Sequence, residues 1–355
     1  MSVEAIQLEK VYKRLSAEQT SFTSRLRAFI KRDYQKVKAL DDVSFRVEPG
    51  EKVTILGPNG AGKSTIIKIL TGIIQSDKGK ATINGFNPQK ERYDAAYQFG
   101  VVFGHRSLLW RHIPVLESLR LYRDVYDLNK EIFEKRLTEF ISVLEIKPFL
   151  HRQPRRLSLG ERMRCELAAS LIHNPSIVFL DEPTIGLDIV AARRIREFIN
   201  ERNELDGTTV ILCSHNVKDI EQICTRAILL LKGKIYFDGP TKELATVLRK
   251  EKQLVFTFRT HEKPVSTLVH FLQKLSTKDN IKITNQDGGS IDILNGDDNS
   301  IRIEYNTDAI DLDFLIQNLL QLVDRVLDIQ ISDADLEDVI EELYTNGAKG
   351  GELPS

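Results

Sequence analysis

The chain has few cysteines, almost no net charge and no long apolar run. Among 355 residues there are 3 cysteines, Cys165, Cys213 and Cys224, and the formal net charge is −1. The cysteines lack metal-ligand spacing, which predicts reduced thiols and no structural zinc site. The near neutrality gives no reason to expect a nucleic-acid partner. No run approaches the roughly 20 apolar residues of a membrane helix, and the first residues lack a signal-peptide core. We therefore expect a cytoplasmic chain that would need a separate protein to reach across a membrane.

The charges that are present divide the chain into two parts. Residues 251–355 hold 9 Lys/Arg and 20 Asp/Glu, so the preceding part is basic. Residues 250–345 also have a pattern of their own, which predicts strand, helix, three strands, helix, strand and helix. We therefore predict a first domain over 1–245, a small α+β accessory or regulatory domain over 250–345 and a disordered tail over 346–355.

Short apolar runs alternate with helical patterns in the first domain. The runs "KVTIL", "SIVFLDE" and "TTVILCSH" predict buried strands, and the stretch at about 105–175 is mainly helical in pattern. This alternation predicts an α/β fold with a largely parallel sheet. Residues 1–12 alternate like an edge strand. Residues 13–38 hold 8 Lys/Arg and 2 acidic residues, and their apolar spacing predicts an amphipathic helical insertion.

A glycine-rich stretch follows the first of these strands and precedes a helical pattern. Its glycines allow backbone N–H groups to surround phosphate oxygens, and the helix N-terminus adds positive potential. Lys63 is expected to reach the β- and γ-phosphates of a nucleotide, and Ser64 to bind Mg²⁺. The stretch "GPNGAGKST" comprises Gly57, Pro58, Asn59, Gly60, Ala61, Gly62, Lys63, Ser64 and Thr65.

Two acidic residues end the apolar run "SIVFLDEP". Charges avoid cores, so acids at the exit of a buried strand suggest a function. Asp181 is expected to hold Mg²⁺ through its waters, and Glu182 to polarise the attacking water. Two solvated acids at a strand end would give the same pattern. The acidic motif therefore indicates a function only in combination with the glycine-rich stretch.

Further motifs follow in a fixed order. They are "LSLGE" at 157–161, "GLD" at 186–188 and a histidine after "ILCS" at 215. Together with the glycine-rich and acidic motifs, they make residues 1–245 resemble the nucleotide-binding subunit of an ATP-binding cassette (ABC) transporter. The glycine-rich stretch matches the Walker A motif, "IVFLDE" the Walker B motif, "LSLGE" the signature, "GLD" the D-loop and His215 the switch histidine.

The resemblance implies an ATPase with composite sites. In this family two cassettes face head to tail, and each ATP lies between Walker A of one and the signature of the other. Ser158 and Gly160 would then contact the γ-phosphate across the dimer, and Asp188 would lie at the interface. His215 would hydrogen-bond the γ-phosphate. ATP and Mg²⁺ are the cofactors this implies.

Two predicted site residues are left open by the sequence: the aromatic that stacks on adenine has two candidates, and a histidine stands where the family has a glutamine. Tyr34 lies 29 residues before Lys63, the spacing expected of the aromatic that stacks on adenine, and Tyr12 is the alternative. The loop after "FGVVFG" carries His105 where the family has a glutamine that ligates Mg²⁺, contacts the attacking water and senses the membrane partner. Mg²⁺ prefers oxygen ligands, so His105 predicts slower and more pH-sensitive hydrolysis. His105 could instead point away from the site.

The wording of the motifs most resembles the type-2 exporter group of bacteria. That group pairs an ATPase homodimer with separate six-helix permease subunits, at the inner face of the cell membrane. The basic segment would lie against lipid or permease, or pack on its own core. Two alternatives remain: a weakened cassette that serves as a structural half, for which His105 and Glu161 are the reason, and a soluble ABC ATPase unconnected with transport.

Overall fold

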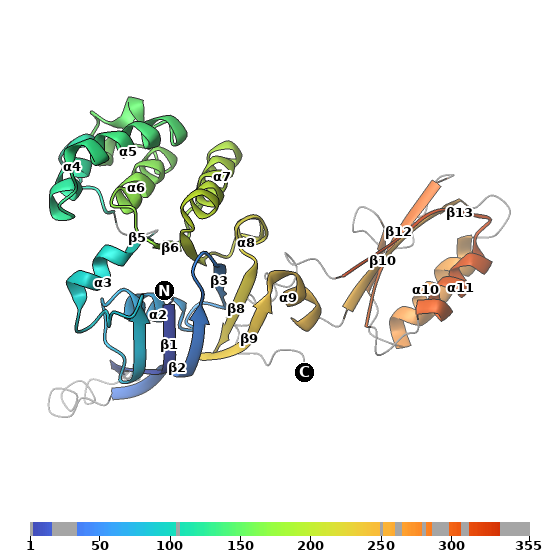
Figure 1. Cartoon of the computed structure of the whole chain (residues 1–355). Coiled ribbons are helices and arrows are strands. Elements are labelled where there is room, and N and C mark those ends of the chain that lie inside the picture. The colour runs from blue at the N-terminus through green and yellow to red at the C-terminus, as the bar shows by residue number, and fades with distance from the viewer. Residues whose placement is uncertain are drawn as a thin grey trace, which may run out of the picture. The chain divides into compact units, whose positions relative to one another are not determined.

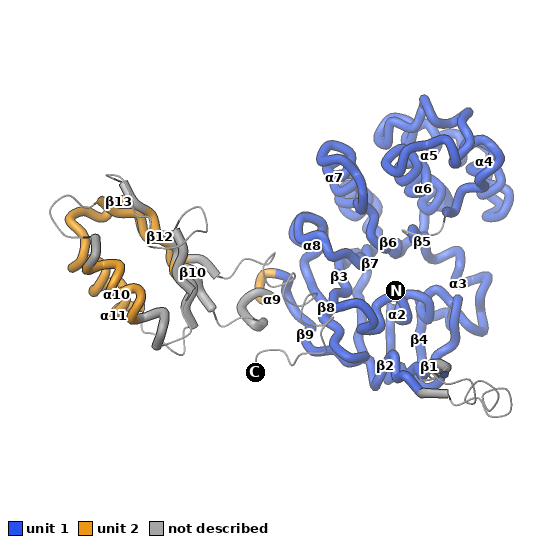
Figure 2. The backbone as a smooth tube through the Cα atoms, turned by 180° about the vertical axis from the view of Figure 1, so that it is seen from behind, with its two compact units in different colours: residues 1–241, 343–355 blue, residues 242–342 orange. Residues whose placement is uncertain are grey.

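The computed structural model describes residues 3–15, 34–103, 107–248, 251–259, 265–278, 282–285, 298–306 and 312–333. These residues form two compact units, one up to Thr241 and the other within Lys242–Glu342 (Figure 2). The predicted α/β fold is confirmed in the first unit, where a six-stranded sheet forms the centre. In spatial order its strands are β5 (Phe99–Phe103), β6 (Ile177–Asp181), β7 (Thr209–Cys213), β3 (Lys52–Leu56), β8 (Arg226–Leu231) and β9 (Lys234–Pro240).

The first five of these strands are parallel. Strand β9 runs antiparallel to β8, and a hairpin at Lys232–Gly233 connects the two strands. Both turn residues have positive φ, 48° and 81°, as a tight two-residue hairpin with the twist of its strands requires. The carboxyl ends of β3, β6 and β7 therefore lie at one edge of the sheet, which is where α/β folds place their ligands.

Two layers bury the central sheet. Along β6, Ile177 and Phe179 pack into one hydrophobic core, and Val178 and Leu180 pack into another on the opposite face. The first core includes a three-stranded antiparallel sheet and α2 (Lys63–Leu70), and the second includes helices. The three strands are, in order, β2 (Tyr34–Val47), β1 (Val3–Leu15) and β4 (Lys78–Ile83). The helices of the second core are α4 (Val115–Val125), α5 (Lys130–Val143), α6 (Leu159–Leu171) and α7 (Ile189–Asp206). Helices α4, α5 and α6 gather as a group beside α7 (Figure 1).

Three shorter helices remain, two in the first unit and the last at the start of the second unit. They are α3 (Arg92–Gln98), α8 (Val217–Ile223) and α9 (Thr241–Leu248). In the part of the chain that the structure describes, no helix combines the length and apolar character needed to cross a membrane.

Two predictions for the first residues are wrong. The run over 1–12 belongs to β1, which is the middle strand of its sheet and not an edge. The segment 13–38 is not helical throughout, because Lys13 to Leu15 pair with Tyr34 to Lys36 in an antiparallel ladder. This long ladder satisfies backbone groups in a way that side-chain periodicity does not reveal. The apolar stripe of the predicted helix lies outside the described residues.

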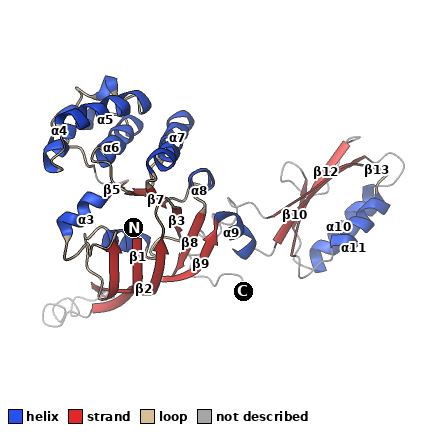
Figure 3. Cartoon of the chain, in the orientation of Figure 1, coloured by secondary structure: helices blue, strands red, loops and turns tan. Residues whose placement is uncertain are grey.

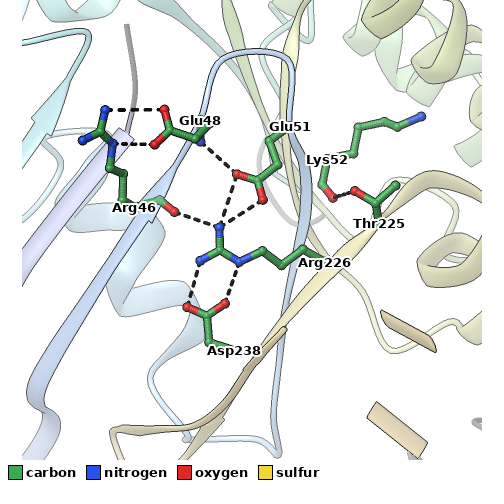
Figure 4. Close-up of polar contacts among 7 residues, drawn as sticks. All are labelled: Arg46, Glu48, Glu51, Lys52, Thr225, Arg226 and Asp238. Atoms are coloured by element: carbon green, nitrogen blue, oxygen red, sulfur yellow. Dashed lines mark hydrogen bonds and ion pairs between the residues drawn. The ribbon is translucent and has the colours of Figure 1, made fainter. Parts of the chain in front are cut away.

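An arginine of β8 connects both sheets behind the glycine-rich loop. Arg226 forms a paired ion contact with Asp238 at 2.6 and 2.8 Å, and it contacts Glu51 at 3.0 Å. It also donates to the carbonyl oxygen of Arg46, at the end of β2 (Figure 4). The bond to Asp238 raises the pKa of Arg226 above its ordinary value. Four strands are thereby tied together at the end of β3 opposite the loop.

The second unit is a βαββαβ fold. It contains β10 (Glu251–Arg259), α10 (Val265–Lys278), β11 (Lys282–Asn285), β12 (Asp298–Asn306), α11 (Leu312–Leu322) and β13 (Arg325–Asp333). The sheet order β11-β12-β10-β13 is that of a ferredoxin-like unit. Both helices lie on one side of the strands (Figure 3) and share a core with them. The additional strand predicted at "GSIDILN", the last predicted helix and the tail lie outside the described residues.

Candidate functional site

The glycine-rich loop runs from β3 into α2, as the motif predicts. Gly57 and Gly62 have φ of 140° and 112°, which only glycine adopts readily. A Cβ at Gly57 would lie 2.2 Å from the carbonyl oxygen of Leu230, and one at Gly62 would lie 2.6 Å from that of Ala39. Neighbouring strands thus press the loop into a tight turn, while its tip at Asn59 and Gly60 stays exposed. The result is a backbone cradle at a helix N-terminus, suited to phosphate.

The ammonium of Lys63 lies within this cradle. Its Nζ donates to the carbonyl oxygens of Gly57 and Pro58, the latter at 3.2 Å. Burial lowers the pKa of Lys63, and the nearby carboxylates of Glu182 and Asp181 oppose this shift. The lysine and the two acids therefore belong to one site, although 118 residues separate Lys63 from Asp181.

Asp181 is the last residue of β6, and Glu182 follows it at the carboxyl edge of the sheet. Asp181 pairs with Phe103 of β5 on one side and with Cys213 of β7 on the other. Glu182 has φ of 54°, and its N–H donates to the carbonyl oxygen of Cys213 at 2.8 Å. The backbone of Glu182 thus leaves strand geometry while it keeps a hydrogen bond to β7. The strained backbone is typical of residues whose position serves a function.

Glu182 and His215 form a close pair. Nδ1 of His215 lies 2.7 Å from Oε1 of Glu182, and the backbone N–H of His215 donates to the same oxygen at 3.2 Å. Ser214 Oγ lies 3.3 Å from the other oxygen. Parallel pairing of β6 with β7 brings these residues together, because the strands end side by side. The ring of His215 is half exposed.

Sequence reasoning missed the buried acid behind this pair. Asp219 in α8 is fully buried and accepts from Arg196 at 2.8 Å, Ser214 at 3.2 Å and Thr184. It therefore joins α7, the end of β7 and the turn after Glu182. The pattern "NVKD" does signal a helix start, since Asn216 caps α8. No local signal identifies the long-range partners of Asp219.

The signature begins a helix with a full capping box. Ser158 Oγ accepts from the N–H of Glu161 at 3.3 Å, and Glu161 accepts from the N–H of Ser158 at 2.8 Å. The bond from Ser158 lowers the pKa of Glu161, and Arg152 lies 3.4 Å from the carboxylate. The charge of Glu161 is thus engaged within its own chain.

The D-loop packs against the signature in the same chain. A Cβ at Gly186 would lie 2.6 Å from Cδ2 of Leu159, and a Cβ at Gly160 would lie 3.3 Å from Cδ2 of Leu187. Asp188 caps α7 by accepting from the N–H of Ala191 at 2.9 Å. Leu159 therefore fills the space that Gly186 leaves open.

Some predicted site residues are placed only in part. His105 lies outside the described residues. Tyr34 pairs with Leu15 at the end of β2, and its side chain is not described. Tyr12 pairs with Val37, and its ring is partly exposed with the ammonium of Lys10 at 5.8 Å. The choice between the two tyrosines stays a prediction.

The residues predicted to bind Mg²⁺ offer the right donor chemistry. The hydroxyl of Ser64 lies in the first turn of α2, and the carboxylate of Asp181 lies beside Lys63. Both provide oxygen, which Mg²⁺ prefers. Among the described residues no cluster of three or more His, Cys, Asp or Glu could hold a metal by itself. An ion here would therefore need phosphate oxygens and water to complete its shell, as nucleotide-bound Mg²⁺ does.

Comparisons with known proteins agree with this geometry. Residues 40–185 match the family model described as ABC transporter. The chain is 31% identical to the ABC transporter ATP-binding protein NatA of Bacillus subtilis, over 61% of this chain and 87% of that protein. It is 30% identical to the methionine import ATP-binding protein MetN of Clostridioides difficile, over 90% of this chain and 96% of that protein. A dimeric ATP-binding cassette bound to ADP and Pi in a post-hydrolysis state superposes with a TM-score of 0.55 at 23% identity, over 67% of this chain and 98% of that one.

The fold and the site define a nucleotide-binding cassette, and the comparisons show to which family it belongs. The chain belongs to the ABC transporter ATP-binding proteins. It is an ABC ATPase, as the motif order predicts. Cassettes of this family dimerise and work with the membrane subunits of transporters.

Proposed function

We propose that this chain is the motor subunit of a bacterial exporter of the type-2 group, acting as a homodimer beneath separate permease subunits. The observation that carries the motor assignment is the pair of Glu182 and His215, 2.7 Å apart, at the sheet edge where Lys63 enters the phosphate cradle. A base, a switch histidine and a phosphate-binding ammonium on one edge are the parts that phosphoryl transfer to water needs.

In this mechanism the chain holds ATP and orients the water. The N–H groups of the loop and Lys63 bind the β- and γ-phosphates, and Ser64 and Asp181 would hold Mg²⁺. Bound Mg²⁺ would neutralise charge on the phosphate oxygens. Glu182 accepts a hydrogen bond from the attacking water, and His215 contacts the γ-phosphate while Glu182 orients its ring.

The second half of each site would come from a partner copy. Ser158, which is exposed, and the half-buried Gly160 lie at the start of a helix, where the positive potential suits a phosphate. Next to Asp188, Ile189 is 83% exposed and Val190 is 61% exposed. Apolar side chains at the start of a helix, beside the D-loop, favour an interface there over a free surface.

An aromatic surface beside the loop after β5 supports a membrane partner. Tyr93 and Tyr97 of α3 and Trp110 are exposed. Exposed aromatic groups of this kind suit contact with another protein. We propose that cytoplasmic segments of the permease dock there, which would hold the chain at the inner face of the membrane. The basic residues over 13–38 would favour contact with anionic lipid.

Export is supported by the wording of the motifs, above all "LSLGERMRCELAASLIHNP" and "DEPTIGLD". Import is the second candidate, because the relative named for methionine import matches 90% of this chain, including residues of the second unit. Purification of the complex from its native membrane separates the candidates: two separate six-helix subunits favour export, and a solute-binding protein required for stimulation favours import. The second unit would dimerise or regulate in either case.

The experiment that tests the motor assignment is ATPase turnover from about pH 6 to 8.5, beside Glu182→Gln and His105→Gln. We expect the parent to turn over, Glu182→Gln to be inactive, and His105→Gln to be faster and less sensitive to pH. If the parent shows no ATPase turnover and His105→Gln restores it, the result would favour the weakened cassette that serves as a structural half. A His105→Gln profile identical to the parent would remove this histidine from the site. Co-purification with ribosomes or DNA and no membrane protein would favour the soluble ATPase.

A further inference from the structure

One buried acid of the signature helix is not explained by ATP chemistry. Glu166 lies two turns after Ser158 in α6, and only 4% of it is exposed. Its carboxylate accepts from the N–H of Leu108 at 2.7 Å and from Ser107 Oγ. Burying a carboxylate costs free energy unless hydrogen bonds compensate, and an apolar residue would fill this place in a helix at no such cost. The acid therefore calls for a reason beyond packing.

The partners of Glu166 follow the loop that leaves β5. Ser107 and Leu108 come directly after residues 104–106, which include His105. From the other side, Tyr122 of α4 donates its hydroxyl to the carbonyl oxygen of Leu108 at 2.9 Å. The N–H of Trp110 donates to Ser118 of α4 at 3.2 Å. Residues 107–110, which we name the linker segment, are thus held between α4 and α6.

This arrangement gives a direct route between two parts of the motor. At one end of α6, Ser158 would meet the γ-phosphate of the partner's ATP. Two turns further on, Glu166 holds the linker segment, whose Trp110 belongs to the exposed aromatic surface. Because Ser158 and Glu166 belong to one helix, a displacement of Ser158 carries Glu166 with it. The linker segment then follows as long as its hydrogen bonds to Glu166 hold.

We propose that Glu166 is a positioning residue that fixes the linker segment to the signature helix and so couples nucleotide binding to the permease-facing surface. The inference rests on the proposed function for the role of Ser158. The hydrogen bonds themselves do not, and they can be tested without ATP. Coupling of this kind requires a defined element that both sites bias, and the linker segment is that element.

The chain provides its own reporter for the test. Trp110 is its only tryptophan, it is 44% exposed, and its ring lies 5.4 Å from that of Tyr122. Emission from the full-length protein therefore reports the linker segment alone. Three variants are compared: Glu166→Gln, the milder Ser107→Ala, and Glu134→Gln as a control. Glu134 is an exposed acid of α5 in the same helical group.

In nucleotide-free protein we expect Glu166→Gln to shift Trp110 emission to longer wavelength, while the control matches the parent. On adding ATP, the parent emission should change, and Glu166→Gln should lose that response although it still binds a fluorescent ATP analogue. Its kcat should fall about tenfold with little change in KM, since the lost contacts lie outside the nucleotide cradle. Ser107→Ala should give the same effects at smaller size.

Defined results would overturn the proposal. Unchanged emission in both Glu166→Gln and Ser107→Ala would show that the carboxylate does not hold the segment. A parent emission that ignores ATP, or an ATP response retained in Glu166→Gln, would remove the coupling. If Glu166→Gln does not fold, Ser107→Ala decides alone, because Ser107 is exposed and its loss is mild. A parent that binds ATP without hydrolysing it would contradict the motor assignment and leave the emission test valid.

Discussion

The two halves of the proposed ATP site are built in different ways. The cradle of Lys63 and the pair of Glu182 and His215 lie at the edge of a sheet, where strand pairing sets their places. The signature at Ser158 begins helix α6 outside that sheet, where Ser158 and Glu161 exchange hydrogen bonds and Glu166 accepts from the N–H of Leu108. We infer that the two halves depend on different interactions for their geometry: strand pairing in the sheet half and side-chain hydrogen bonds in the signature half. The predictions below test this difference.

The largest effect is expected in the sheet half from Glu182→Gln. The amide keeps the shape but no longer accepts a proton, so turnover should fall by at least about a hundredfold. ATP binding should persist, because the cradle is intact. Turnover and binding of a fluorescent ATP analogue, measured on one preparation, check both statements. Turnover near that of the parent would mean that Glu182 does not act on the water.

The next largest effect concerns the free energy of unfolding and the buried contact of Asp219 with Arg196, which lies behind Glu182 and His215. Asp219→Ala leaves Arg196 buried without its partner, which should cost about 3–5 kcal/mol of unfolding free energy. The matched control is Glu197→Ala, which removes an exposed partner from Arg193 and should cost about 0.5 kcal/mol or less. Urea unfolding measures both. Equal costs would show that the buried contact does not organise the sheet half.

A third change acts at the contact between the D-loop and the signature. Gly186→Ala places a methyl group against Leu159 at a position with φ of 68°, and should cost about 1–3 kcal/mol. Leu159→Gly in the same chain removes the clash and should recover part of that loss. Thermal unfolding of both single variants and the double variant gives the interaction free energy. Strict additivity would mean that the two residues do not touch.

The smallest effect belongs to the cap of the signature. Glu161→Gln keeps a residue that can close the capping box, so we expect a loss of about 0.5 kcal/mol at neutral pH. The pKa of Glu161 is lowered in the folded chain, so its contribution is present above the unfolded value and is lost as the pH falls through the folded value. The two proteins should therefore unfold alike in acid. A difference that persists there would exclude the carboxylate as its source.

Much of the sheet half could be predicted from the sequence. The loop around Lys63 and the acids after β6 have local signals, because apolar runs and glycines directly reflect strand ends and tight turns. The fold class followed from the same runs. The helix expected over 13–38 is wrong at both ends, because strand pairing of residues 13–15 with residues 34–36 overrides local periodicity there. Asp219 and Glu166 escaped prediction because their partners are distant in sequence, and only the folded chain brings them together.

The central claim is that each ATP site is shared between two copies, and mixing two inactive variants tests it most directly. Lys63→Ala destroys the cradle and Ser158→Ala the signature, so each homodimer should be silent. In a head-to-tail heterodimer one site keeps an intact cradle from one chain and an intact signature from the other. We predict that an equal mixture regains turnover, about a quarter of the parent value for statistical pairing and independent sites. A mixture as silent as its components, with heterodimers shown to form, would contradict the account.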